Sequence, residues 1–156
     1  MPKPWRALIP LMLLLAACAT PAVDSVSDSK IGYVNEGAAA SADWTNAVTV
    51  KVMVADFQFE PDHLTFESGK AYRLDLENKS KSTHFFAAEE FFKSVVTEKL
   101  VEGGNSVDRP LLKAIALAPG ETKEILFVPI RKGTYELQCT APFHKALGMS
   151  GTIDIT

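Results

Sequence analysis

Three side chains that bind soft metals lie within eleven residues near the end of the chain. Cys139, His144 and Met149 follow one another at two equal steps of five residues, in the stretch CTAPFHKALGM. A cysteine thiolate and a neutral imidazole bind copper or zinc, and a methionine thioether is a soft ligand that favours copper. Two histidines, one cysteine and a weak axial methionine make a trigonal copper site. The stretch supplies one histidine, so a second must come from elsewhere.

The chain contains three histidines, so His63 and His84 are the two candidates for the second imidazole. His84 follows the segment AYRLDLEN and a short polar loop, which places it near the end of a predicted strand, where one rim of a sandwich gathers. His63 stands beside Asp62 at the start of a predicted strand, and we expect it to be a surface residue. We therefore predict a metal site made of His84, Cys139, His144 and Met149.

Three other interpretations of these side chains stay open. Cys139 could be a buried structural cysteine, with His144 in a loop and Met149 as packing. Zinc could bind His84, Cys139 and His144, although such a site would resemble an open catalytic one and no general base is evident. Cys139 and a histidine could form a nucleophilic pair, although the loop offers no acid to orient the histidine. Of the metals considered, only copper would also use Met149 as a ligand.

A two-residue apolar period runs through much of the chain after residue 47 and predicts half-buried antiparallel strands. The segments at 48–54, 71–78 and 134–139 show it most clearly. In the last segment Tyr135, Leu137 and Cys139 have the same parity, so we expect the thiol to point inward at the end of a strand. Several such strands, with turns every 8–12 residues or so, indicate a β-sandwich or barrel.

One segment, at about residues 87–102, has a different pattern. Its apolar residues come in pairs, at 91–92, 95–96 and 100–101, spaced four to five apart. Glu89 and Glu90 would lie in the first turn of a helix, and Gly103 and Gly104 would end it. The expected fold class is therefore all-β, a Greek-key sandwich or barrel with one inserted helix around residues 87–102.

The first residues have the pattern of a secretory signal. Lys3 and Arg6 precede an apolar run at 7–17, which is too short for a confident membrane span. The run ends in LAAC, which resembles a bacterial lipoprotein signal and implies cleavage before Cys18 and lipidation of that residue. A plain secretory signal cleaved nearby is the alternative. We predict a signal peptide at 1–17, a lipid-anchored flexible tether at 18–46 and a copper-binding domain at 47–156.

The lipoprotein resemblance has consequences for location and for the second cysteine. It implies an exported, periplasmic protein anchored to a bacterial membrane, and Ala19 after the lipidated cysteine favours the outer membrane. Cys139 would then be a lone thiol in an oxidising compartment, open to oxidation unless a metal bond protects it. The formal charge of −3 and the scattered basic residues predict no nucleic-acid partner.

From about residue 47 to 156 the chain resembles the cupredoxins. FEPDHLTFESGKAYRLDLEN is similar to the opening strands of that family, which lead to its first copper histidine. LAPGETKEILFVPIRKGTYELQCTAPFHKALGMSGTIDI is similar to its closing half, and the gaps of four residues within the ligand loop are similar to those of rusticyanin-like members. One residue departs from the pattern: Phe85 follows the first histidine, where most members have asparagine or serine.

The resemblance implies a type 1 copper protein, blue or green, that carries single electrons at the outer face of a membrane. Cys139 would be the thiolate ligand, His84 and His144 would complete the trigonal plane, and Met149 would be the axial ligand of one ion that alternates between Cu(I) and Cu(II). A transient redox partner would dock on apolar groups near His144. An enzyme is not expected, since related copper enzymes need further histidine-rich centres. A periplasmic copper chaperone or resistance protein is the alternative.

Overall fold

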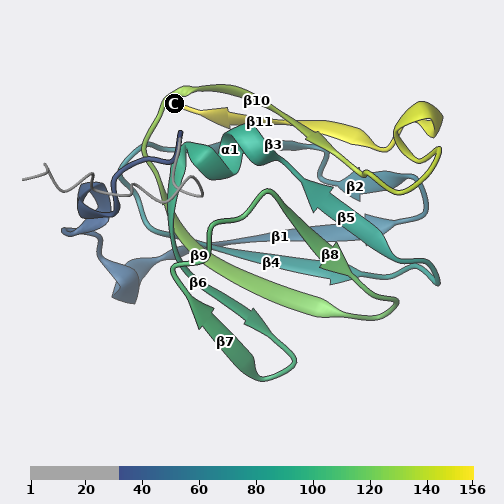
Figure 1. Cartoon of the computed structure of the whole chain (residues 1–156), viewed down its shortest axis with the longest axis horizontal. Helices are drawn as coiled ribbons and strands as arrows, with labels where there is room; N and C mark the ends of the chain where they lie inside the picture. Colours follow the sequence, from purple (N-terminus) through teal and green to yellow (C-terminus); the bar gives the residue numbers. More distant parts are fainter. Residues whose placement is uncertain (1–31) are drawn as a thin grey trace, which may run out of the picture.

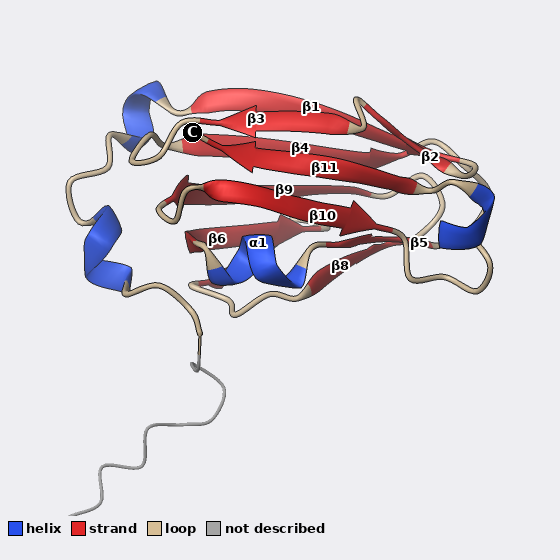
Figure 2. Cartoon of the chain, turned by 90° about the horizontal axis from the view of Figure 1, so that it is seen from above, coloured by secondary structure: helices blue, strands red, loops and turns tan. Residues whose placement is uncertain are grey.

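Alternating apolar residues form two β-sheets that pack face to face (Figures 1 and 2). The computed structural model describes residues 32–156, so the predicted signal peptide and Cys18 lie outside the described residues. The inward residues of both sheets form one apolar core, which includes the fully buried Leu74, Leu76, Phe86, Leu137 and Ile153. The predicted all-β sandwich is therefore confirmed.

The first sheet has six strands and the second has five. The order in the first sheet is β2 (Gln58–Glu60), β1 (Val48–Ala55), β4 (Tyr72–Asn78), β9 (Thr122–Pro129), β6 (Val95–Glu102) and β7 (Asn105–Asp108). The order in the second is β3 (His63–Phe66), β11 (Ser150–Ile155), β10 (Gly133–Gln138), β5 (His84–Ala87) and β8 (Ala114–Leu117). The pairs β1–β4 and β3–β11 are parallel, and the other pairs are antiparallel.

The helix predicted at 87–102 is much shorter than expected. Helix α1 covers Glu89–Lys93 only, and the rest of that segment is strand β6. The strand pairs with β9, and its register shifts between Thr97 and Lys99. Such a bulge adds one residue, so the inward positions change parity and Thr97 and Leu100 both face the interior. The resulting three-residue step mimics helical spacing, whereas the β-branched residues that open β6 favour a strand.

The segment at 32–46 precedes β1 and makes hydrogen bonds to the rest of the domain. It contains two short 3₁₀-helices, η2 (Glu36–Ala39) and η3 (Trp44–Asn46). The N–H of Val34 donates to the carbonyl of Lys93 (3.0 Å), and the Tyr33 hydroxyl donates to the carbonyl of Leu112 (2.7 Å). The segment falls within the tether predicted at 18–46, and the boundaries of tether and domain stay a prediction. Within the described residues, no helix has the length and apolar character that a membrane crossing needs.

The two ends of the sandwich carry different parts of the chain. The loop from residue 139 to 149, which contains the 3₁₀-helix η4 (Lys145–Leu147), lies at one end in both views. Residues 36–46 lie at the opposite end (Figures 1 and 2). The predicted ligand loop is therefore far from the point at which the N-terminal segment joins the domain.

Candidate metal centre

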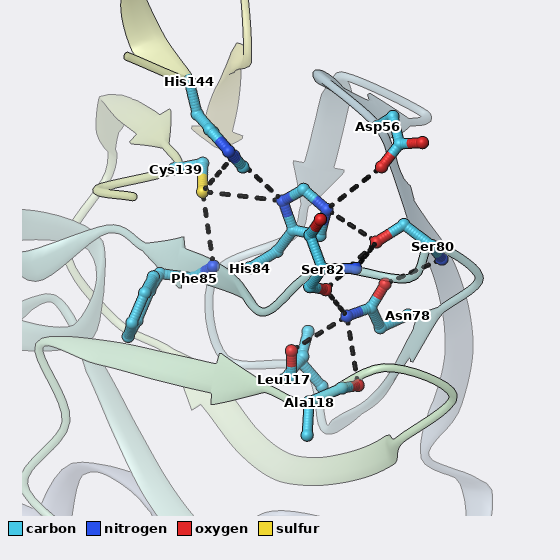
Figure 3. A network of polar contacts seen from close by, with 10 residues as sticks. All are labelled: Asp56, Asn78, Ser80, Ser82, His84, Phe85, Leu117, Ala118, Cys139 and His144. Atoms are coloured by element: carbon cyan, nitrogen blue, oxygen red, sulfur yellow. Dashed lines mark hydrogen bonds and ion pairs between the residues drawn. The ribbon is translucent and has the colours of Figure 1, made fainter. Parts of the chain in front are cut away.

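Cys139 follows strand β10 directly and points into the sandwich, as its parity predicts. Its side chain is fully buried. Its N–H donates to the carbonyl of Met149 (3.1 Å), which closes the base of the ligand loop. Its sulfur accepts a hydrogen bond from the backbone N–H of Phe85 (3.4 Å, Figure 3). This hydrogen bond fixes the position of the sulfur, and a cysteine binds metal through its thiolate sulfur.

His84 is the first residue of β5 and is also fully buried. The antiparallel strands β5 and β10 pair at their ends, through Ala87 and Gln138, so the start of β5 lies beside the residues that follow β10, although 55 positions separate His84 from Cys139. The pairing explains how a distant imidazole reaches the thiol. The Nδ1 atom of His84 lies 3.8 Å from the sulfur of Cys139 (Figure 3).

The ligand loop holds His144 and Met149 through its own backbone. The N–H of His144 donates to the carbonyl of Ala141 (3.1 Å), and the N–H of Met149 donates to the carbonyl of His144 (3.0 Å). Between them Gly148 has a φ of +100°, a conformation that glycine adopts without steric strain. Met149 is fully buried and belongs to the same cluster as the two histidines and the cysteine.

Three donor atoms lie at distances that suit a single metal ion. The Nδ1 atoms of His84 and His144 are 3.2 Å apart, and they lie 3.8 Å and 3.5 Å from the sulfur of Cys139. A triangle with these sides has a circumscribed radius of about 2.0 Å. Zinc forms bonds of about 2.0–2.1 Å to nitrogen and about 2.3 Å to thiolate sulfur. The donor set therefore fits one soft or borderline ion held by these three atoms.

A polar network on the far side of His84 fixes the orientation of its ring. The Nε2 atom lies 2.8 Å from the Ser80 hydroxyl, which leaves Nδ1 for the metal (Figure 3). The buried Asn78 holds the loop around Ser80: its Oδ1 accepts from the N–H of Ser80 (2.9 Å), and its Nδ2 donates to the Ser82 carbonyl (2.8 Å). Asn78 also ties this loop to β8 through the carbonyls of Leu117 and Ala118.

The electrostatics of the site favour the neutral form of His84. Burial lowers the pKa of His84 below its usual value, and the neighbouring His144 lowers it further. The carboxylate of Asp56, 3.9 Å from Nε2, acts in the opposite direction and does not reverse the shift. A neutral imidazole offers a free lone pair on Nδ1, so the lowered pKa favours metal binding near neutral pH.

Apolar side chains surround the part of His144 that reaches the surface. Phe143 is 81% exposed and Leu147 is 60% exposed, and both belong to the ligand loop. Phe57, in the turn between β1 and β2, is 43% exposed and lies edge-on to the His144 ring, with centroids 5.1 Å apart. Exposed apolar side chains that cluster on a surface mark an interaction site, whereas single exposed apolar residues are common and need no explanation.

The structure brings together the four predicted site residues and separates His63 from them. His63 is exposed, and its Nε2 lies 2.8 Å from Oδ2 of Asp154 on β11. Sequence reasoning missed Asn78, Ser80 and Phe57. The polar run after β4 gave a weak signal for the first two. Nothing in the sequence indicated that Phe57 would contact His144.

Comparison with known proteins agrees with this geometry. A profile of the cupredoxin-like domain family matches residues 9–153, so the chain belongs to that family. Its single copper ion and copper-binding character follow from the family, the fold and the cluster of His84, Cys139, His144 and Met149. No match was found among curated proteins.

Solved structures with a similar fold include auracyanin B and parts of larger copper enzymes. The structure of auracyanin B shares 25% identity over 73% of this chain and 92% of its own, with a TM-score of 0.50. A multicopper oxidase from Campylobacter jejuni shares 15% over 69% of this chain (TM-score 0.54), and the copper nitrite reductase NirK from Thermus scotoductus SA-01 shares 15% over 70% (TM-score 0.53). This chain spans only 29% and 31% of those two enzymes, and the likeness to them shows the fold alone.

The prediction that the chain is not an enzyme is wrong, because the fold does not exclude an enzymatic role. Multicopper oxidases and a nitrite reductase share its fold, although they are larger proteins, so the fold does not separate carriers from enzymes. The prediction relied on counting histidines. That count limits the ligands of one chain only, and it does not apply to a centre shared between chains. An enzymatic role stays open.

Proposed function

We propose that this protein is a type 1 copper electron carrier. In this proposal His84, Cys139 and His144 would be the main ligands of the ion, and Met149 would be a weak fourth ligand. Copper bound there would supply a Cu(II)/Cu(I) couple. The observation that carries the proposal is the triangle of donor atoms, whose sides of 3.2, 3.5 and 3.8 Å suit one ion at about 2.0 Å from each atom.

The surrounding residues would keep the site rigid while the charge of the ion changes. His84 is fixed through Ser80 and Asn78, and Cys139 is fixed by hydrogen bonds on both its N–H and its sulfur. The core around them is close-packed, with both side chains fully buried. Since donors that cannot move add little rearrangement to a change of oxidation state, such a frame suits fast transfer of single electrons.

The exposed apolar surface at the ligand loop would be the docking site of a transient redox partner. Phe143 and Leu147 flank His144, and a small apolar contact of this kind suits weak, short-lived complexes. We expect Leu147→Asp to slow electron transfer to a partner protein severalfold without changing the absorption spectrum or the reduction potential. Stopped-flow kinetics with the isolated partner measure the rate. An unchanged rate would mean that these side chains only shield the metal.

The location of the protein is a proposal from sequence. The resemblance of the segment around Cys18 to a lipoprotein signal supports export and anchoring to a bacterial membrane, with the outer membrane favoured by Ala19. Two or more acyl chains give stable anchoring. Mass spectrometry of the protein purified from its own cells would show acyl chains on Cys18. An unmodified mature N-terminus elsewhere would contradict the proposal.

Spectroscopy of the copper-loaded protein tests the carrier proposal directly. A copper–thiolate bond should give a strong absorption band near ~600 nm, or extra intensity near ~450 nm for a green site, together with a reversible redox couple. Cys139→Ser should abolish the band, whereas His63→Asn, at an exposed histidine outside the cluster, should leave it intact. Tight binding without a reversible couple, with copper passing to an acceptor protein, would instead indicate copper handling.

A further inference from the structure

The two histidines of the metal centre are held in different ways. The Nε2 atom of His84, which is the outer ring nitrogen relative to the metal site, lies 2.8 Å from the Ser80 hydroxyl. The outer nitrogen of His144 has no hydrogen-bond partner among residues 32–156, and it is not buried. Histidines that bind metals are normally oriented by a hydrogen bond on the second ring nitrogen. His144 therefore needs another support, and among the described residues Phe57 is the one aromatic side chain outside the metal centre that makes a ring contact with it.

Phe57 occupies an unfavourable position for a large aromatic residue. Its φ is +63°, in the left-handed region that bulky residues rarely adopt, and 43% of its surface is exposed. Both features oppose the placement: the backbone is strained, and the exposed apolar ring gains little from burial. A residue in this turn would normally be glycine or asparagine. The contact that the strained conformation secures is the edge-on packing of Phe57 against His144, with a 65° angle between the rings.

We propose that Phe57 is the positioning residue of His144, in the role that Ser80 has for His84. The Phe57 ring lies at 5.1 Å from the imidazole and restricts its rotation, so that Nδ1 stays directed at the sulfur of Cys139. Phe57 comes from the turn between β1 and β2, outside the ligand loop. It therefore couples the loop to the first sheet. The inference rests on copper binding by His84, Cys139 and His144, and it is independent of the carrier role.

An edge-on pair of rings favours one arrangement over others by a factor of about two to ten. Loss of the Phe57 ring should accelerate release of copper by a factor in that range, because His144 leaves the ion more often. It should also alter the ligand-to-metal charge-transfer band. In the metal-free protein, NMR signals of the His144 ring should become averaged over several orientations, whereas those of the His84 ring should not change.

The test compares Phe57→Ala with Phe143→Ala in the full chain. Phe143 is a matched control because it is also aromatic, exposed, next to His144 and at positive φ (+67°), but has no ring contact with the histidine. Phe57→Tyr keeps the ring and should restore the wild-type rate. Phe57→Gly removes the ring and relieves the strained φ, so it provides a folded variant if Phe57→Ala is unstable.

Transfer of copper to a chelator, followed by absorption, measures the rate of release. We expect about two- to tenfold faster release in Phe57→Ala and Phe57→Gly, and wild-type rates in Phe57→Tyr and Phe143→Ala. Equal rates in all variants, or equal acceleration by Phe57→Ala and Phe143→Ala, would overturn the inference. Failure of the carrier proposal would show differently, as the absence of a reversible couple in the wild-type protein, and the NMR comparison on metal-free protein does not depend on that couple.

Discussion

At the scale of single residues, Asn78 connects the loop that carries Ser80 to strand β8. It is fully buried, and its amide nitrogen lies 2.8–3.0 Å from the carbonyl oxygens of Ser82, Leu117 and Ala118. Asn78→Ala would leave these acceptors without their donor, so we expect a loss of about 2–4 kcal/mol in the free energy of unfolding. Urea denaturation measures it. Ser82→Ala keeps the accepting carbonyl and should cost far less; equal losses would refute this role of the Asn78 side chain.

Phe85 is the residue that departs from the pattern of the family. Its N–H donates to the sulfur of Cys139, and its side chain packs against the apolar core. An apolar neighbour excludes water from the site and favours the less charged Cu(I) state. We expect Phe85→Asn to lower the reduction potential, by roughly 59 mV if the relative affinity for the two oxidation states changes tenfold. Redox titration checks this, and a potential that stays the same or rises would contradict it.

At the scale of elements, the bulge in β6 leads to a test by deletion. Glu98 is the extra residue, so its removal should leave Thr97 and Leu100 facing the core and the pairing with β9 in register. We expect the deletion to cost only about 1–2 kcal/mol, because Glu98 accepts a hydrogen bond from the N–H of Arg109. Deletion of Glu124 from the regular strand β9 should prevent folding, since it turns the following side chains to the other face.

Circular dichroism and thermal unfolding distinguish the two deletions. Similar destabilisation by both would show that the register shift in β6 is not a tolerated insertion.

Three strands of the second sheet meet at Asp154, and their contact predicts a pH dependence. The hydroxyl of Thr134 on β10 and the ring of His63 on β3 both contact this carboxylate. The Thr134 hydrogen bond, followed by that of His63, lowers the pKa of Asp154 below its usual value. The contribution to stability is therefore complete above the unfolded-state pKa, about 3.9, and disappears as the pH falls through the lower folded-state pKa.

We expect Asp154→Asn to be less stable than the wild type at pH 7 and to approach the wild-type stability as the pH falls through the lowered pKa of Asp154. Thr134→Val removes the largest cause of the lowered pKa of Asp154, so it should bring the folded-state pKa closer to the unfolded-state value. The stability that Asp154 contributes should then be lost over a narrower pH range. Urea midpoints measured between neutral and acid pH give the comparison. A constant difference between Asp154→Asn and wild type across that range would exclude the linkage.

At the scale of the whole molecule, the sequence predicted the sandwich and the four clustered side chains because both depend on simple rules. Alternating residues face alternate sides of a strand, which directed Cys139 inward, and His84 came at a strand end on the same rim. The extent of α1 was not predictable in this way, because the bulge in β6 changes the parity that periodicity relies on. Contacts such as that of Phe57 with His144 depend on one backbone torsion in a turn, and sequence patterns carry little information about it.

The ligand loop and residues 36–46 lie at opposite ends of the sandwich (Figures 1 and 2). This separation determines how the protein behaves when it is immobilised on an electrode. Immobilised on gold through the side that carries η2 and η3, the molecule would turn its metal centre toward the bulk solution. A link placed beside Phe143 would turn it toward the electrode. Because tunnelling falls steeply with distance, a centre that transfers electrons as proposed should give a small current in the first orientation and a large one in the second.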